Sequence, residues 1–266
     1  SESINVPMTG YLARKLVYFA DDIVVNDSND CGTNEGIDVY IFINSKKISD
    51  SELTDRLYGR VINEDISIKY QESDNISKKL ELKKGDIIDH KTLKQISGST
   101  IHKINVRSPL KCKNEDGCCP ICYGMDLARA KPVKKGTPIG VIAAQSLSEP
   151  LTQLQLKNFH TGGVSQGGSI EDSFKIISGL LHGSQDGIGL TIDFSKFQTN
   201  EEAINYQREV MTEVIYKTFK SCGASINKKH IELIVKKLVM FDNLSRVNDF
   251  FLIDINKGFA SSITKK

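Results

Sequence analysis

Four residues in segment 140–163 combine an amide, an apolar side chain, a cation and an imidazole at helical spacing. They are Gln153, Leu156, Lys157 and His160, and their i, i+3, i+4, i+7 spacing places them on one face of an α-helix. A face that packs into a core is normally apolar, whereas this set is suited to gripping a nucleotide. A partly exposed amphipathic helix with one stray histidine is an equal alternative on the pattern alone.

Six cysteines occur, and four of them lie between positions 112 and 122. In a reducing compartment such a cluster indicates metal binding rather than disulfides. Cys119 and Cys122 form a C-x-x-C knuckle, which lets two thiolates reach one Zn²⁺. Cys112 can supply a third thiolate, and Cys31 is the best candidate for the fourth. We expect a closed structural zinc site, the alternative being a reduced thiol cluster without metal.

Two cysteines are left outside this predicted site. Cys118 competes for the ion, but adjacent residues rarely point at one ion, so we expect a packed or exposed thiol. Cys222 precedes Gly223 at an expected helix end, and we predict that it is a buried small residue.

Composition is ordinary for a soluble globular protein, with 39% hydrophobic and 26% charged residues in a chain of 266. The net charge of +2 excludes a strongly polyanion-coating protein but allows a local basic surface. Its candidates are Arg129, Lys131, Lys134 and Lys135, with a solvated charge run as the equal alternative. No apolar run approaches the ~20 residues of a membrane span and no signal-peptide core is visible, so we expect a cytoplasmic protein without a membrane partner.

The hydrophobic pattern predicts an α+β fold. A helix is expected over 10–25, with Pro7 tolerated only in its first turn, and strands over 37–43, 61–68 and 101–106. Thr137 and Pro138 predict a helix start, and Pro150 predicts an interruption with a new turn near Glu149. Further helices are expected after capping boxes at 169–172 and 199–202 and over 229–240, with an easily melted glycine loop at 161–168.

Five motifs in a fixed order resemble the C-terminal part of the β′ (largest) subunit of multisubunit DNA-dependent RNA polymerase. They are GYLARKLV, DCGTNEGI, CKNEDGCCPICYGMDLAR, GVIAAQSLSEPLTQLQLKNFHTGG and INKKHIELIVKKL. The resemblance covers nearly the whole chain. It implies four regions: the end of the bridge helix (1–25), a small β-rich subdomain with the zinc staple (26–135), the trigger-loop helical hairpin (136–185) and a C-terminal helical region (186–266).

The resemblance gives the polar stripe a role in closing the active site over the incoming nucleoside triphosphate. It implies that Gln153 approaches the ribose and that Leu156 caps the base. It places Lys157 and His160, as catalytic residues, along the triphosphate. Whether His160 donates a proton or only positions and stabilises stays open. Lys157 stands where the family has arginine and Leu156 where it has methionine, changes that keep the charge and the volume.

The family's catalytic motif NADFDGD, whose aspartates hold Mg²⁺, does not occur in this sequence. We therefore expect the chain to be inactive alone and Mg²⁺ to be held by a partner chain. The implied partners are an N-terminal β′ fragment, β-like subunits, a promoter-specificity factor, template DNA, RNA and NTP substrates. The short trigger-loop connection is most like a split β′ subunit of a large bacteriophage. Its location would then be the host cytoplasm, with packaging in the virion left open.

Two further interpretations follow from the same residues. Arg14 and Lys15 are expected to contact nucleic-acid backbone, against the even alternative of a solvated helix face. For the whole chain, the alternative is a non-catalytic zinc-stapled scaffold or regulator with a polymerase-derived fold. A free-standing zinc enzyme fits poorly, because four cysteines leave no open coordination position.

Overall fold

A computed structural model of the protein describes residues 2–27, 29–71, 77–161 and 197–239. Within these ranges the chain mixes helices with small two-stranded antiparallel sheets, as the α+β prediction requires. It divides into two compact units. The helical unit comprises the described parts of Ser1–Asp21, Gly140–Ile226 and His230–Lys266, and the sheet unit comprises Asp22–Ile139 and Asn227–Lys229.

The sheet unit contains the strands, paired as β1–β6, β2–β3, β4–β5 and β7–β8. The strands are β1 (Ile37–Tyr40), β2 (Phe42–Ile43), β3 (Lys46–Lys47), β4 (Ile66–Gln71), β5 (Ser77–Leu82), β6 (Lys103–Val106), β7 (Met125–Asp126) and β8 (Lys131–Pro132). Its helices are α2 (Asp50–Leu57), α3 (His90–Ser97), η1 (Pro109–Lys111) and α4 (Pro120–Tyr123). The predicted strand 37–43 is thus divided into β1 and β2, and 101–106 is present in shorter form as β6. The predicted strand 61–68 is displaced, because β4 begins at Ile66 and Val61 and Ile62 form only isolated bridges.

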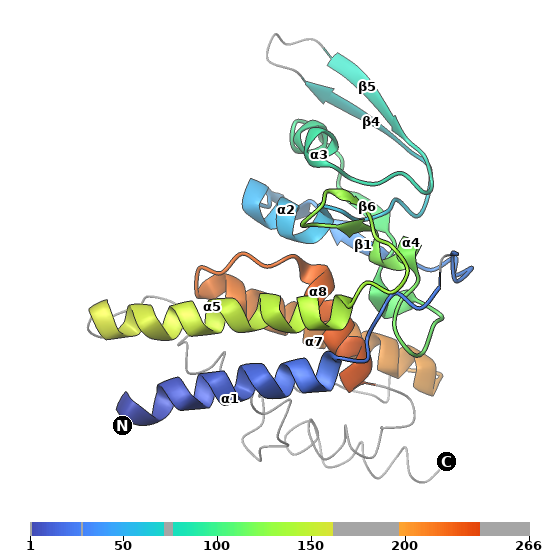
Figure 1. The fold of residues 1–266 in the computed structure, drawn as a ribbon. Helices are drawn as coiled ribbons and strands as arrows, with labels where there is room; N and C mark the ends of the chain where they lie inside the picture. The colour runs from blue at the N-terminus through green and yellow to red at the C-terminus, as the bar shows by residue number, and fades with distance from the viewer. Residues whose placement is uncertain (1, 28, 72–76, 162–196, 240–266) are drawn as a thin grey trace. The chain divides into compact units, whose positions relative to one another are not determined.

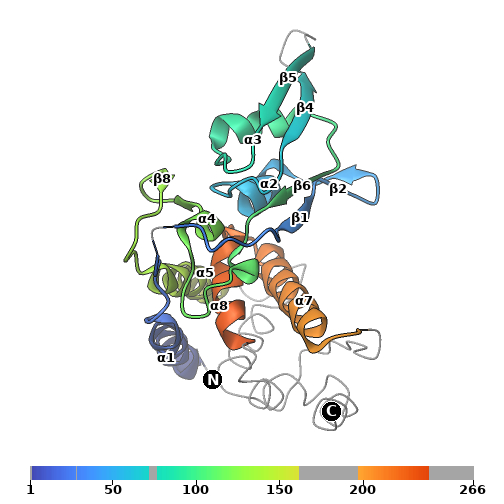
Figure 2. The same ribbon diagram turned by 90° about the vertical axis from the view of Figure 1, so that its right-hand side faces the viewer.

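One apolar core holds the larger part of this unit together. Its buried members come from β1, α2, β4, β5, α3 and β6 and from the segments that connect the elements of this unit: Val39, Ile41, Ile48, Leu53, Leu57, Ile62, Ile68, Leu82, Ile88, Leu93, Ile96, Ile104 and Val106. The β4–β5 register places Ile66 opposite Leu82 and Ile68 opposite Leu80, so apolar side chains share one face of the hairpin. Both views show α3 beside this hairpin (Figures 1 and 2).

The first helix, α1 (Glu2–Ala20), is longer at its start and shorter at its end than the predicted span 10–25. The expectation that Pro7 would lie in the first turn is wrong, because the helix begins at Glu2 and runs through it. The chain leaves the helix at a turn over Asp21 and Asp22. By Val25 the backbone is extended and forms an isolated bridge with Cys118.

Helix α5 (Ile139–Thr161) carries the polar stripe and begins directly after Thr137 and Pro138, as predicted. The Thr137 hydroxyl donates to the carbonyl of Lys134 (2.6 Å) in the turn that precedes the helix. Pro150 does not interrupt it, since the helix continues through this position. Hydroxyls on both sides of Pro150 bond to carbonyls four residues earlier, Ser146 to Ile142 and Thr152 to Ser148. Such bonds often accompany bends, which accommodate a proline without ending a helix.

Helix α7 (Asn200–Ser221) starts and stops as its sequence signals predict. Thr199 is the N-cap, and its hydroxyl accepts a hydrogen bond from the Glu202 amide (3.2 Å). At the other end, the amides of Gly223 and Ala224 donate to the carbonyls of Lys220 and Phe219. With Gly223 at φ +79°, this is a Schellman motif, which satisfies carbonyls that the helix leaves unpaired.

The hydrophobic pattern of helix α8 (Lys228–Leu238) places Ile231, Ile234, Val235 and Leu238 on one apolar face, but the helix is buried on more than that face. Ile231, Ile234 and Val235 are buried as expected, but Leu238 is only partly buried. Four charged or titratable residues of the same helix are also buried: Lys229, His230, Glu232 and Lys236. The helix therefore has polar packing on faces that the hydrophobic pattern assigns to solvent.

Two predicted features fall outside the described residues. They are the glycine loop from Gly162 to Gly168 and the helix expected after the capping box at 169–172. Among the helices that the structure describes, none combines the length and the hydrophobicity needed to cross a membrane.

Gly124 and Gly136 offer a matched test of how tightly the chain is packed after α4. Both have positive φ, +84° and +81°, but a Cβ at Gly124 would lie 2.2 Å from the Gly59 carbonyl oxygen, whereas one at Gly136 would meet nothing within 4 Å. We expect Gly136→Ala to cost about 1–2 kcal/mol, the penalty of a left-handed backbone. Gly124→Ala should cost about 1–3 kcal/mol more, because the backbone must also shift. Denaturant unfolding measures both losses, and equal losses would contradict the close approach.

Candidate metal centre

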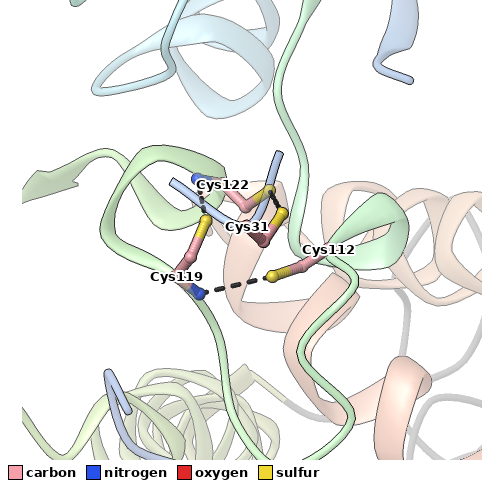
Figure 3. A group of neighbouring side chains, drawn as sticks. All are labelled: Cys31, Cys112, Cys119 and Cys122. Atoms are coloured by element: carbon pink, nitrogen blue, oxygen red, sulfur yellow. Dashed lines mark hydrogen bonds between the residues drawn. The ribbon is translucent and has the colours of Figure 1, made fainter. Parts of the chain in front are cut away.

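Four cysteine sulfurs converge in the sheet unit (Figure 3). The Sγ atoms of Cys31, Cys112, Cys119 and Cys122 all lie within 4.8 Å of one another. Three of these side chains are buried and Cys31 is partly exposed. The set is the one that spacing and the family resemblance selected, so the structure brings together all four predicted ligands.

Local backbone structure places three of the sulfurs. Cys119 is the N-cap of α4, and its sulfur accepts a hydrogen bond from the Cys122 amide (3.3 Å). This single turn, with Pro120 in its first position, brings the two cysteines of the knuckle together. Cys112 follows η1, and its sulfur accepts a hydrogen bond from the Cys119 amide (3.3 Å).

Cys31 reaches the cluster from a distant loop. Its sulfur lies 3.7 Å from that of Cys122 and accepts a hydrogen bond from the Lys113 amide (3.5 Å). The loop turns through Gly32, which has φ +73°, and the Asp30 carboxylate accepts a hydrogen bond from its amide (3.1 Å). Amide donors aimed at sulfur favour the thiolate that a metal ion requires.

The proximity of the thiols shifts their pKa values. The neighbouring Cys112 raises the pKa of Cys119 to about 11, and Cys112, Cys119 and burial raise the pKa of Cys122 as well. Thiolates packed this closely repel one another, so without a cation the protons stay on. A divalent ion would favour the thiolate form instead, because it attracts the negative sulfurs and displaces the protons of the thiols. Four sulfur donors in a buried, closed set could hold such an ion.

Arg107 belongs to the centre, although the sequence reasoning did not single it out. Its Nη2 atom lies 3.2 Å from the Cys122 sulfur and 3.5 Å from that of Cys31. Both Nη atoms also donate to the Asp30 carboxylate, at 3.0 and 2.5 Å. Burial lowers the pKa of Arg107, but the bonds to Asp30 and Cys122 outweigh it, so the pKa is raised. The same bond lowers the pKa of Asp30.

Lys229 is a second residue that the sequence reasoning missed. Its fully buried ammonium lies 4.0 Å from the centroid of the Tyr123 ring and donates to the carbonyls of Tyr123 (3.2 Å) and Met125. It thereby satisfies the last carbonyl of the knuckle helix α4 and the first carbonyl of β7. The signal was present as a lysine within the motif INKKHIELIVKKL, but the apolar pattern places that position outside the core face.

The two remaining cysteines are separate from the cluster. Cys118 is fully buried, in agreement with a packed thiol, and its amide donates to the Val24 carbonyl (3.1 Å). Cys222 is the C-cap of α7 and is partly exposed, so the prediction of a buried residue is wrong. A helix end leaves its cap at the surface, which explains the difference.

The other predicted residues lie on helices, in the short strand β8 or in exposed loops. Gln153, Leu156, Lys157 and His160 share the helical backbone of α5, while the placement of their side chains lies outside the description. Arg14 is exposed on α1, and the Lys15 ammonium lies 4.8 Å from the Tyr11 ring centroid. The basic residues Arg129, Lys131, Lys134 and Lys135 are all exposed. Neither nucleic-acid contact nor simple solvation is favoured by these positions.

Comparison with known proteins identifies the relatives of this chain. Residues 2–181 match the family described as RNA polymerase Rpb1, domain 5. The chain is 43% identical over 163 residues to the DNA-directed RNA polymerase subunit β′ of Thermodesulfovibrio yellowstonii. This alignment covers 61% of the chain and 11% of that subunit. It is also 33% identical over 228 residues to the β′ subunit of a Hydrogenobaculum species, in an alignment that covers 79% of the chain and 14% of that subunit.

The chain therefore belongs to the RNA polymerase Rpb1, domain 5 family and is homologous to the bacterial β′ subunit. The match extends from α1 through the cysteine cluster and α5. In the relatives named above, the aligned part is only 11% and 14% of the subunit's length.

Adjacent cysteines provide an internal control for metal binding. Cys119→Ser should abolish stoichiometric Zn²⁺ binding, because it removes a thiolate from a four-sulfur set, whereas Cys118→Ala should retain it. Elemental analysis of the purified variants measures the bound ion. A Cys119→Ser protein that keeps its full Zn²⁺ content would exclude this residue as a ligand.

Proposed function

We propose that the chain is the part of a DNA-directed RNA polymerase β′ subunit that closes over the incoming NTP during transcription. The observation that carries the proposal is the family match over residues 2–181, which includes the whole of α5. Helix α5 is continuous for 23 residues, so its stripe is presented on one rigid element. As part of this subunit, the chain belongs to a nucleotidyltransferase.

The proposed roles follow from the chemistry of the four stripe residues. Gln153 would hydrogen-bond the ribose, and Leu156 would cover the base and exclude water from the new pair. Lys157 and His160 would lie along the triphosphate and stabilise the negative charge that develops toward the departing pyrophosphate. An ammonium gives Lys157 a point charge without the bidentate fork of arginine.

The chain supplies only part of the reaction. Phosphoryl transfer needs carboxylates that hold Mg²⁺, and the family motif NADFDGD lies outside these 266 residues. We propose that other polymerase subunits, template DNA, RNA and a promoter-specificity factor complete the assembly. A separate subunit of a bacteriophage, working in a host cytoplasm, stays a hypothesis, and the relatives named above are bacterial.

The cysteine cluster is proposed to hold one structural Zn²⁺. Four thiolates fill a tetrahedral site and leave no position for substrate, so the ion would join chain segments rather than catalyse. The fit rests on the convergence of the four sulfurs and on the N–H donors directed at them.

His160→Ala tests the closing helix in the reconstituted polymerase. Single-nucleotide addition at saturating NTP should slow by roughly 10²-fold, the usual contribution of a positioned acid or electrostatic group. Asn158→Ala is the control, since helical periodicity places position 158 away from the stripe. Equal rates for the His160→Ala enzyme and the wild type, with assembly intact, would refute the role of His160.

The second candidate function is a non-catalytic scaffold or regulator that retains the polymerase fold. The closed cysteine site favours it, because such a site only joins chain segments. A polymerase preparation that lacks the chain distinguishes the two functions. Full elongation activity without the chain would support the scaffold, and loss of elongation would support the catalytic part.

A further inference from the structure

The guanidinium of Arg107 lies between the Asp30 carboxylate and two sulfurs of the cysteine cluster. Nη2 contacts Asp30 Oδ1, Cys31 Sγ (3.5 Å) and Cys122 Sγ (3.2 Å), while Nη1 donates to Asp30 Oδ2 (3.0 Å). One side chain thus touches two predicted ligands and the residue beside one of them. This arrangement is distinct from the ligand set itself.

Charge explains why a cation belongs at this position. Four thiolates around a divalent ion carry a net charge of −2, which is costly in a buried site unless it is compensated. Arg107 is only 1% exposed, so it too needs compensation, and the sulfurs and the carboxylate provide it. Its Nε atom is buried without a hydrogen bond, which indicates that the Nη contacts decide where the guanidinium lies.

Geometry explains why the cation is arginine. The planar fork bonds both oxygens of Asp30 and still directs one nitrogen at the sulfurs. A lysine ammonium is a point charge and would not hold the carboxylate in a bidentate contact. The charge and the shape of arginine are therefore both used.

Cys31 is the ligand for which this contact matters most. It is the partly exposed member of the set, and it comes from a loop rather than from η1 or α4. Arg107 follows β6 directly, so its bonds to Asp30 and Cys31 attach that loop to a strand of the apolar core. Loss of these bonds would free the loop. We then expect the Cys31 thiolate to be the first ligand to leave the ion.

The geometry points to a new role for the Arg107–Asp30 pair: it is an outer-sphere latch that keeps Cys31 and Cys122 on the metal and sets how slowly the ion is lost. Arg107 is in this sense a positioning residue for the centre. The inference rests on the proposed zinc centre.

Zinc release from the full chain tests the latch. The chain is loaded with one Zn²⁺, mixed with an excess of chelator, and followed with a colorimetric zinc indicator. Arg107→Gln should release the ion about 10- to 100-fold faster, the usual effect of removing an outer-sphere partner. Arg107→Lys and Asp30→Asn should give smaller accelerations. The double variant Asp30→Asn/Arg107→Gln should release zinc no faster than Arg107→Gln alone, because the two residues act as one unit.

The matched control is Arg56→Gln. Arg56 is also a buried arginine of the sheet unit with a carboxylate partner, Glu52 at 2.9 Å, and that partner lies one turn away on α2. It should release zinc at the wild-type rate. Co²⁺ substitution provides a spectroscopic check, since an unchanged thiolate charge-transfer band in Arg107→Gln shows that all four ligands are kept at equilibrium.

The outcomes separate this inference from the proposed function. Wild-type release kinetics in Arg107→Gln, or an acceleration equal to that in Arg56→Gln, would overturn the latch while the zinc centre stands. A wild-type chain that takes up no Zn²⁺ would refute the centre and the latch together. Should Arg107→Gln fail to fold, Arg107→Lys and Asp30→Asn decide the question by the same measurement.

Discussion

The structure around the cysteine cluster depends on the convergence of four sulfurs from parts of the chain with little structure of their own. Helix α4 has four residues, and the loop that carries Cys31 has no regular structure. A single helical turn is far below the length that is stable alone. Thiols at this spacing raise one another's pKa, so without a cation they stay protonated and make only weak contacts with one another. An ion bound here would therefore contribute directly to folding.

Buried charges surround this centre and restrict how the chain can pack. Arg107 is directed by Asp30 and two sulfurs, and Lys229 by two carbonyls and the Tyr123 ring. Each of these side chains would destabilise the fold if its partners moved, because a buried charge without partners costs several kcal/mol. Such contacts define one arrangement of the knuckle more strictly than apolar packing does.

Helix α5 connects the fold to the proposed reaction. Its continuity through Pro150 keeps the stripe residues on one element, so a single movement would bring all of them to a nucleotide. The helix lies within the region that matches the polymerase family, as do α1 and the cysteine cluster. The chemistry proposed for His160 and Lys157 is electrostatic assistance to a reaction whose metal-binding carboxylates we propose to lie in another part of the polymerase.

Local signals in the sequence were sufficient where the cause of a structure is local. The cap at Thr199, the Schellman end at Gly223 and the knuckle at Cys119 depend on residues a few positions apart, and all are present. Spacing and family resemblance also selected Cys31 rather than Cys118 as the fourth predicted ligand, and the structure places Cys31 in the cluster. Only the tertiary structure decided that Pro150 stays within a helix, that Cys222 is partly exposed and that Arg107 and Lys229 are buried. Burial of a charge depends on partners up to 106 positions away, and no local pattern records them.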